Sequence, residues 1–426
     1  MAHLCFILFF YYNNPMNRLK IIFFQQKETI TSMCGMLWGM LELGADLFQA
    51  GTLVTDRDHT EEELESVLSD IDNAISKELS PGQTPVLMTQ DFCTPVAEAA
   101  HLREIPYISW PYDSPQEAFY RKEVLYDTNI LFCFDKRMME RLDKRGVKNL
   151  FYEPLAANLH AAELADLSDE NLSRYASDIS FVGNFYVDKK RKEAFDQIKT
   201  GLPRIYDEIE KILNHAEGNF AKKERLFGRL SDDILKWLRQ NSSDVNNIED
   251  TADAYFLIEC YILTRELAER ERIGALRELG KAGHVKVYTS EPDKTSIADL
   301  TGAEILDKVS YDTEMPIIFA ASKINLNITV PGIESGIPQR VFDILGMGGL
   351  CLTNWQPEME ELFDTSKELA VAKDYGELKE KAEFYLKNEK ARLEMSLAGY
   401  LKVKECYTYP KAMKRILEKS CEVFMI

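Results

Sequence analysis

One loop and the helix that follows it contain the residues best suited to bind a phosphate. The stretch Ile324–Asn354 predicts a strand, a loop with glycines, a helix and a Gly-rich turn into another strand. Pro338 suits the first helical turn because it has no N–H to leave unpaired there. The other N–H groups of that turn, and the positive end of the helix dipole, can hold an anion. Arg340 lies in the same turn and could form a bidentate contact with a phosphate.

Asp343 comes three residues after Arg340, on nearly the same face of the predicted helix. A carboxylate there can accept hydrogen bonds from both hydroxyls of a ribose. Phosphate donors, an arginine and a ribose-binding acid within about one helical turn indicate a nucleotide-diphosphate site. The alternative is a solvent-exposed turn with an incidental Arg–Asp pair, because this stretch is neither a Walker motif nor GxGxxG.

Two further carboxylates follow predicted strands and could contact a hydroxyl group of a bound molecule. Asp113 comes after the strand Pro106–Trp110, and Asp91 after the strand Pro85–Thr89. A carboxylate at a strand end could act as a general base or bind a sugar hydroxyl. The alternative for each is an Asp that caps its own turn, as Asp113 could do beside Ser114.

These residues need a scaffold, and the chain predicts one of buried strands alternating with helices. Continuous apolar runs predict strands buried on both faces, as in parallel sheets. The predicted strands are Leu19–Phe24, Pro85–Thr89, Pro106–Trp110, Asn129–Phe134, Lys148–Glu153, Asp178–Gly183, His284–Thr289, Lys323–Thr329 and Leu350–Asn354. The predicted helices are Thr31–Leu43, Thr94–Leu102, Lys136–Lys144, Gln339–Leu345, Tyr375–Lys387 and Lys390–Tyr400. We therefore expect an α/β protein of two Rossmann-like, doubly wound domains with a ligand cleft between them.

The length of 426 residues agrees with more than one domain. We expect an apolar extension at residues 1–15, an acceptor-side domain at 16–170 and a second domain at 171–408 with a helical insertion at about 195–280. The polar, acidic stretch Asn158–Tyr175 is the expected linker. A last helix at 409–426 could return to the first domain.

Charge and composition exclude some classes of partner. The net charge of −19 argues against nucleic acid, which needs a basic face. Scattered cysteines without a CxxC pair suit a reducing cytoplasm. The apolar run Cys5–Tyr12 is shorter than the roughly 20 residues of a membrane span, so we expect at most a peripheral membrane contact there. No metal site is expected.

A longer stretch around the phosphate loop resembles a known family. SKINLNITVPGIESGIPQRVFDILGMGGLCLTNWQPEMEELF, continuing through ELAVAKDYGELKEKAEFYL, is similar to the C-terminal domain of CgeB-like (spore-maturation-type) glycosyltransferases of the group-1, two-domain GT-B superfamily. In the first half, YISWPYDSP, NILFCFDKRMMERL and FYEPLAAN stand at family-like places. The resemblance covers the chain from about Leu19 to about Tyr409 and implies a GT-B fold and glycosyl transfer.

The resemblance also implies roles for particular residues. Ser335 and Gly336 would offer backbone N–H groups to the diphosphate, Arg340 would neutralise it and Asp343 would bind the ribose. The first acid of the family's acidic pair falls on Ser335 here, with Glu334 one residue away, which is a departure from the pattern. The segment FVGN, ending in Gly183 and Asn184, resembles the first turn of the donor domain. The residues expected to bind the donor are Gly183, Asn184, Arg191, Asn327, Thr329, Glu334, Ser335, Gly336, Arg340 and Asp343.

The expected function is transfer from a nucleotide sugar, with UDP favoured and GDP as the alternative, to a carbohydrate, glycoprotein or other hydroxyl acceptor. We expect a cytoplasmic enzyme that needs no metal and no cofactor, because helix dipole, N–H groups and an arginine can stabilise the diphosphate. A nucleotide-sugar epimerase and a non-catalytic carbohydrate- or protein-binding module are the alternatives. A Rossmann dehydrogenase is disfavoured, because GxGxxG is missing after Leu19–Phe24.

Overall fold

The computed structural model describes residues 18–27, 33–55, 58–187, 189–221, 226–240, 248 and 250–425. This part of the chain divides into two compact units. The N-terminal unit comprises the residues up to Ala156 and those from Cys406 onward, and the C-terminal unit comprises Ala157–Glu405. The sequence places the corresponding boundaries at residues 170 and 408. The predicted extension at 1–15 and its apolar run lie outside the described residues.

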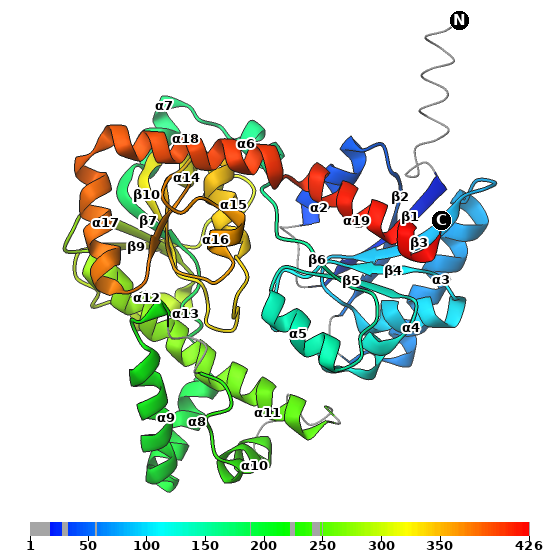
Figure 1. The fold of residues 1–426 in the computed structure, drawn as a ribbon, viewed down its shortest axis with the longest axis horizontal. Helices are drawn as coiled ribbons and strands as arrows, with labels where there is room; N and C mark the ends of the chain where they lie inside the picture. The colour runs from blue at the N-terminus through cyan, green and yellow to red at the C-terminus, as the bar shows by residue number, and fades with distance from the viewer. Residues whose placement is uncertain are drawn as a thin grey trace, which may run out of the picture. The chain divides into compact units, whose positions relative to one another are not determined.

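The N-terminal unit is built on a six-stranded sheet in the order β2-β1-β3-β4-β5-β6, with every pair of neighbours parallel (Figure 1). The strands are β1 Leu19–Gln26, β2 Asp46–Val54, β3 Thr84–Thr89, β4 Tyr107–Ser109, β5 Asn129–Cys133 and β6 Leu150–Tyr152. The helices are α2 Met33–Glu42, α3 Glu61–Glu78, α4 Thr94–Arg103, α5 Lys136–Lys144 and α19 Tyr409–Phe424, with 3₁₀ turns at Glu117–Tyr120 and Lys122–Leu125. The central strands are buried on both faces, as expected for a parallel sheet covered by helices.

The C-terminal unit holds a second six-stranded parallel sheet, in the order β12-β11-β10-β7-β8-β9. Its strands are β7 Ser177–Val182, β8 Val285–Thr289, β9 Ala303–Asp307, β10 Ser322–Asn327, β11 Cys351–Asn354 and β12 Ala370–Ala372. Its shorter helices are α6 Leu159–Leu164, α7 Asp169–Tyr175, α13 Glu291–Ser296, α14 Met315–Ala321, α15 Gln339–Gly346 and α16 Met359–Leu362. Its longer C-terminal helices are α17 Tyr375–Lys387 and α18 Glu389–Cys406. The two sheets confirm the predicted α/β class.

Between β7 and β8 the chain forms a helical insertion that extends away from the sheet (Figure 1). It comprises α8 Lys189–Gly201, α9 Pro203–Ala216, α10 Asp232–Gln240, α11 Thr251–Glu259, a π-helical turn at Cys260–Thr264 and α12 Arg265–Leu279. The last of these helices returns to the sheet, because Ala275, Leu276 and Leu279 belong to its core. The insertion is therefore anchored through α12.

The last helix of the chain packs in the N-terminal unit against α2. Tyr409 is 2% exposed, and a methyl group added to Gly35 or Gly39 of α2 would overlap the ring or the backbone of that tyrosine. The two glycines thus allow the close approach of the two helices. Arg415 adds an ion pair with the buried carboxylate of Glu153, 2.5 Å between Nη2 and Oε1.

The structure contains several elements that the sequence patterns did not predict. The edge strand β2 is half exposed and carries polar residues, so it lacks the continuous apolar run of a central strand. Helix α3 is acidic and buries only Val67, Ile71 and Ala74. The stretch Asn158–Tyr175, interpreted as a linker, forms α6 and α7.

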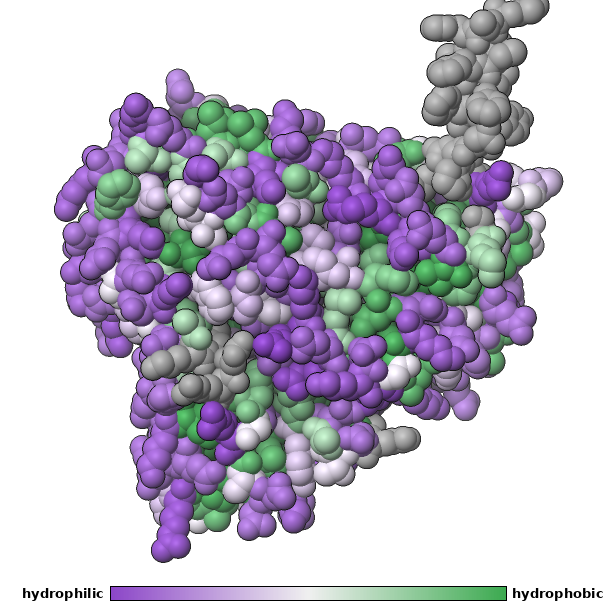
Figure 2. All heavy atoms as spheres, in the orientation of Figure 1, coloured by the Kyte–Doolittle hydropathy of each residue, from purple (hydrophilic) through white to green (hydrophobic). Residues whose placement is uncertain are grey.

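The visible surface is mostly hydrophilic, with hydrophobic residues scattered between charged ones (Figure 2). This agrees with the 28% of charged residues in the sequence. Within the described ranges, no helix combines the length and the apolar character needed to cross a bilayer.

Candidate donor site

The predicted phosphate loop joins β10 to α15 at the carboxyl edge of the second sheet. Pro338 is the N-cap of α15, with φ −71° and ψ 157°, and no side chain caps the start of this helix. Three side chains of this helix, Val341, Ile344 and Leu345, are fully buried and hold the helix in position. An uncapped helix start at the carboxyl edge of a parallel sheet is suited to hold an anion.

Asp343 lies inside this region with one oxygen bound and the other unoccupied. Its Oδ1 accepts hydrogen bonds from Tyr311 Oη at 2.9 Å and from Gln339 Nε2 at 2.8 Å. Its Oδ2 is buried and has no hydrogen-bond partner among the described residues. The residue as a whole is only 9% exposed. Burial raises the pKa of Asp343, and the nearby charge of Arg340 opposes this increase. A buried acceptor without a partner is costly unless a ligand completes it.

Arg340 lies one turn before Asp343 and is half-buried against α14. Its Nη1 contacts the Met315 sulfur, and its guanidinium lies 5.6 Å from the centroid of the Phe319 ring. These contacts hold the guanidinium beside the first turn of α15. The structure therefore brings Arg340 and Asp343 to the same helix start, as the spacing predicts.

The glycine loop itself is held by residues that follow β11. Ser335 Oγ donates to Glu358 Oε1 at 2.6 Å, and Gln356 Nε2 donates to the carbonyl of Ile333 at 2.9 Å. Ser335 and Gly336 are buried, whereas Glu334 is partly exposed. The hydroxyl of Ser335 is thus directed to a protein carboxylate.

Asn327 and Thr329 connect the ends of β10 and β11. Asn327 Nδ2 donates to Thr329 Oγ1 at 3.1 Å and to Thr353 Oγ1 at 2.9 Å. Thr329 N donates to Asn354 Oδ1 at 2.7 Å. The amide nitrogen of Asn354 is buried and, within the described part of the chain, has no acceptor. These two predicted site residues hold the base of the loop in this structure.

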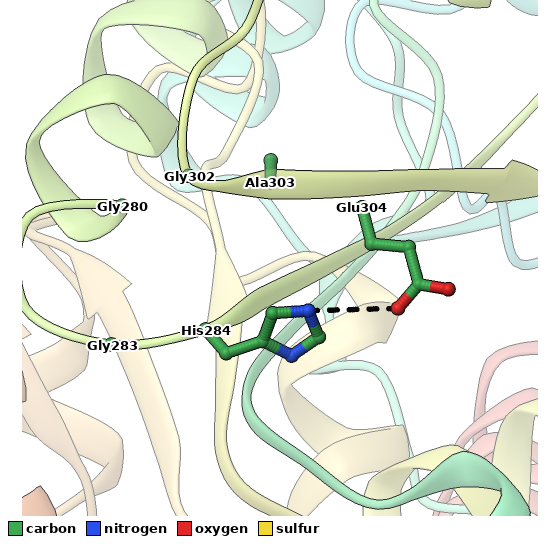
Figure 3. Close-up of a pocket in the computed structure, with 6 residues that line it drawn as sticks. All are labelled: Gly280, Gly283, His284, Gly302, Ala303 and Glu304. Carbon is green, nitrogen blue, oxygen red and sulfur yellow. Dashed lines mark ion pairs between the residues drawn. The ribbon is translucent and has the colours of Figure 1, made fainter.

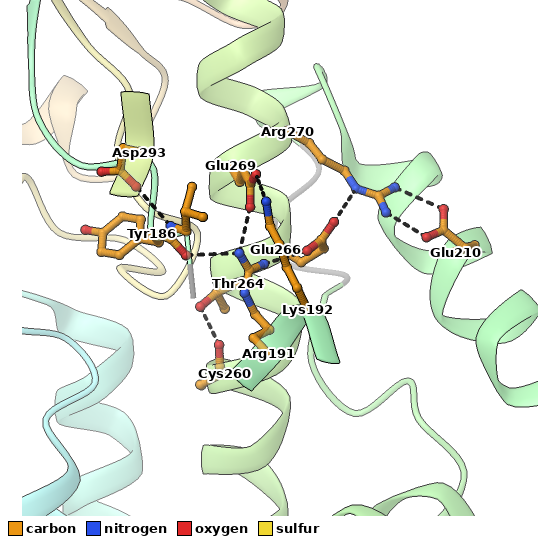
Figure 4. A network of polar contacts seen from close by, with 11 residues as sticks. Tyr186, Arg191, Lys192, Glu210, Cys260, Thr264, Glu266, Glu269, Arg270 and Asp293 are labelled. Atoms are coloured by element: carbon orange, nitrogen blue, oxygen red, sulfur yellow. Dashed lines mark hydrogen bonds and ion pairs between the residues drawn. The ribbon is translucent and has the colours of Figure 1, made fainter. Parts of the chain in front are cut away.

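The other predicted donor residues lie in the turn after β7 and in α8, and Arg191 of α8 forms ion pairs within the protein. Figure 4 shows its guanidinium between two carboxylates of α12, with Nη1 2.5 Å from Glu266 and Nη2 2.7 Å from Glu269. The same nitrogen Nη2 donates to the carbonyl of Tyr186 at 2.9 Å. Arg191 is 2% exposed, so in this conformation it holds α8 against α12. Contact with a phosphate would require these ion pairs to open.

Gly183 and Asn184 lie at the end of β7, where a second arginine ties two loops together. Arg272 donates to the carbonyl of Asn184, and its Nη2 donates to the carbonyl of Ile328 at 2.9 Å. The side chain of Arg272 thus joins the loop after β7 to the loop after β10. Sequence reasoning missed it, since it lies in the insertion among many charged helical residues.

Asp293 is a second residue that the sequence did not indicate. It is 3% exposed and accepts hydrogen bonds from the backbone N–H groups of Phe185 at 2.8 Å and Val187 at 3.1 Å. Asp293 is the third residue of α13, and the hydroxyls of Thr289 and Ser290 also donate to its Oδ2, each at 3.1 Å. Asp293 therefore fixes the backbone of the turn that holds Gly183.

The two acceptor-side candidates belong to the N-terminal unit. Asp91 follows β3 and is 6% exposed; its Oδ1 accepts a hydrogen bond from Tyr112 N at 2.8 Å. Asp113, after β4, is exposed. Asp91 therefore shapes the turn after β4, whereas the Asp113 side chain is open to solvent. Both lie at the carboxyl edge of their sheet, as predicted.

A shallow depression at the opposite edge of the second sheet is lined by glycines and one ion pair (Figure 3). His284 and Glu304 form this pair, 3.6 Å between Nε2 and Oε2, at the amino ends of β8 and β9. The depression therefore lies apart from the candidate site residues that follow β7 and β10. Among the described residues, no group of three or more His, Cys, Asp and Glu side chains could hold a metal ion.

Comparisons with known proteins address the fold and the class of the protein. Residues 265–418 match the family model described as glycosyl transferase-like. A search among curated proteins gave no match.

Among solved structures, a glycosyltransferase from Rickettsia africae is similar with a TM-score of 0.58 and 10% identity over 96% of this chain and 99% of that one. Sucrose-phosphate synthase from Thermosynechococcus elongatus gives a TM-score of 0.54 at 8% identity, over 96% of this chain and 100% of that one. Anabaena HepE, in complex with UDP and glucose, gives 0.52 at 8% identity, over 94% and 98%.

At these identities the structural likeness shows the fold, which is the GT-B architecture. The family match adds the enzyme class for the part of the chain that carries the candidate donor loop. The protein is therefore a glycosyltransferase of GT-B fold, and the glycosyl transferase-like segment lies mainly in the C-terminal unit and ends in α19.

Proposed function

We propose that this glycosyltransferase takes its sugar from a nucleotide-diphosphate sugar bound at the start of α15. The observation that carries the proposal is the buried Oδ2 of Asp343, which has no partner among the described residues, next to a helix start that no side chain caps. A ribose hydroxyl would satisfy this oxygen. The diphosphate would then meet the N–H groups of Ser335, Gly336 and the first turn of α15.

In the proposed reaction, these N–H groups and Arg340 stabilise the negative charge that develops on the leaving diphosphate. The groups are fixed before the reaction, because buried side chains hold both the loop and the helix. This arrangement supports a transfer that needs no metal and no cofactor. We favour UDP over GDP as the carrier, and HepE, which is solved with UDP and glucose, is consistent with that choice.

The acceptor is proposed to be a carbohydrate, a glycoprotein or another hydroxyl compound bound by the N-terminal unit. Asp113 is the better candidate for contact with the acceptor hydroxyl, because it is exposed at a strand end, whereas Asp91 is only 6% exposed. We further propose the CgeB-like, spore-maturation-type subgroup and a cytoplasmic location, on the sequence motifs and composition alone.

Calorimetric titration with UDP, GDP and ADP tests the donor site. Arg340→Ala should weaken binding of the preferred nucleotide by about tenfold or more, on the order of 1.5–3 kcal/mol for a contact to a charged group. Arg204→Ala, at an exposed arginine of α9, is the matched control and should bind as the wild type does. Equal affinities of the Arg340 variant and the control would remove Arg340 from the site.

A further inference from the structure

Three side chains at the end of β11 and in the segment that follows it hold the phosphate loop at successive points. Asn354, Gln356 and Glu358 alternate along the chain and bind three residues of the loop after β10. The contacts are Thr329 N to Asn354 Oδ1 at 2.7 Å, Gln356 Nε2 to the Ile333 carbonyl at 2.9 Å, and Ser335 Oγ to Glu358 Oε1 at 2.6 Å. The third contact lies at the residue whose backbone is proposed to face the diphosphate.

Glu358 differs from the other two side chains because it is an acid in a dry environment. It is 1% exposed and its partner Ser335 is 3% exposed. The pair is reciprocal, since the backbone N–H of Glu358 donates to the carbonyl of Ser335 at 3.2 Å. A hydrogen bond to a buried carboxylate is stronger than one between neutral groups, so this contact is the firmest of the three.

We infer that Glu358 is a positioning residue of the donor site, acting through Ser335. Its carboxylate accepts a hydrogen bond from the Ser335 hydroxyl, and its backbone N–H donates one to the Ser335 carbonyl. The bond to the carbonyl fixes the peptide plane between Ser335 and Gly336, which also contains the N–H of Gly336, so that this N–H is oriented toward the second phosphate of the donor. This role rests on the proposed function, because it concerns the same diphosphate site.

The arrangement has a specific electrostatic consequence. The hydrogen of the Ser335 hydroxyl is directed at the Glu358 carboxylate and partly compensates its negative charge. The hydroxyl is then not a donor to the ligand. Removal of Glu358 releases the side chain and the carbonyl of Ser335, so it should weaken binding of ligands that carry the second phosphate more than binding of ligands that lack it.

Calorimetry of the full chain with UDP and with UMP tests the inference. We expect Glu358→Ala to lower UDP affinity at least about tenfold and UMP affinity less than about threefold. Glu358→Gln keeps an acceptor for the hydroxyl and should recover part of the loss. Glu360→Gln, at an exposed acid two residues away, is the control and should bind both nucleotides as the wild type does.

Ser335→Ala is a second test in case Glu358→Ala does not fold. It removes the same hydrogen bond by deleting the donor hydroxyl in place of the acceptor. The double variant of Ser335 and Glu358 should then lose no more UDP affinity than the worse single variant. Wild-type UDP affinity in Glu358→Ala, or equal losses for UDP and UMP, would overturn the positioning role. A wild-type chain that binds neither UDP, GDP nor ADP would overturn the proposed function itself, which is a distinguishable result.

Discussion

Asp343→Asn separates the binding role of Asp343 from its effect on stability. Asn keeps an oxygen that can accept from Tyr311 and Gln339, the two donors observed at Oδ1. It replaces Oδ2, the oxygen without a partner among the described residues, by an NH₂ group that cannot accept a hydrogen bond from a ribose hydroxyl. The variant should therefore lose ribose binding while it keeps the local packing.

The expected loss follows from one hydrogen bond to a charged group, about 1.5–3 kcal/mol, or roughly 10- to 150-fold in UDP affinity. Isothermal calorimetry measures it directly. Asp364→Asn, at an exposed carboxylate of the same unit, is the matched control and should leave UDP binding unchanged. An Asp343 variant with the affinity of the control would refute the ribose contact.

The pKa of Asp343 also predicts how the free energy of unfolding changes with pH. The direction is opposite to the one expected for a carboxylate in a structural ion pair. Burial raises the pKa of Asp343 above its ordinary value of 3.8. The folded chain then binds this proton more tightly than the unfolded chain, so ionisation lowers the free energy of unfolding as pH rises from about 3.8 through the folded pKa. Asn does not ionise. Chemical denaturation of the wild type and of Asp343→Asn should thus show that the free energy of unfolding of the variant rises relative to that of the wild type as pH rises. A relative decrease would contradict burial as the cause of the raised pKa.

Two further changes test the packing of the last helix. Gly39→Ala places a methyl group 2.8 Å from the backbone of Tyr409 and should lower the free energy of unfolding by about 1–3 kcal/mol, whereas Gly201→Ala, with open space around it, should not; urea denaturation compares them. Arg415→Ala leaves the buried Glu153 carboxylate without its bidentate partner and should cost about 1–3 kcal/mol at pH 7. Because burial already raises the pKa of Glu153, the loss should become smaller as pH falls and the lone acid takes up a proton, and a loss that grows toward low pH would count against this explanation.

Much of the scaffold could be predicted from local pattern. Lys136–Lys144 was predicted as a helix with the bounds that α5 has, and each predicted strand overlaps an observed one. The buried central strands are continuous apolar runs, so they can be recognised from the sequence. The edge strands β9 and β12 are short or polar, so the same signal is weak there.

The site was only partly readable, because its decisive contacts join residues distant in sequence. The spacing of Arg340 and Asp343 was visible, but the burial of Asp343 and its bond to Tyr311 depend on the loop after β9. Likewise, a basic stretch gave no sign that Arg191 pairs with two acids of α12. Glu358 stands near other glutamates in the sequence, and only the fold distinguishes it from them.

A crystal structure of the chain with UDP bound tests the central claim most directly. The account predicts the diphosphate against the backbone of Ser335 and Gly336 at the first turn of α15, with a ribose hydroxyl in hydrogen-bond distance of Asp343 Oδ2. UDP ordered at another place, such as the depression beside His284 and Glu304, with Asp343 Oδ2 still without a ligand, would contradict it.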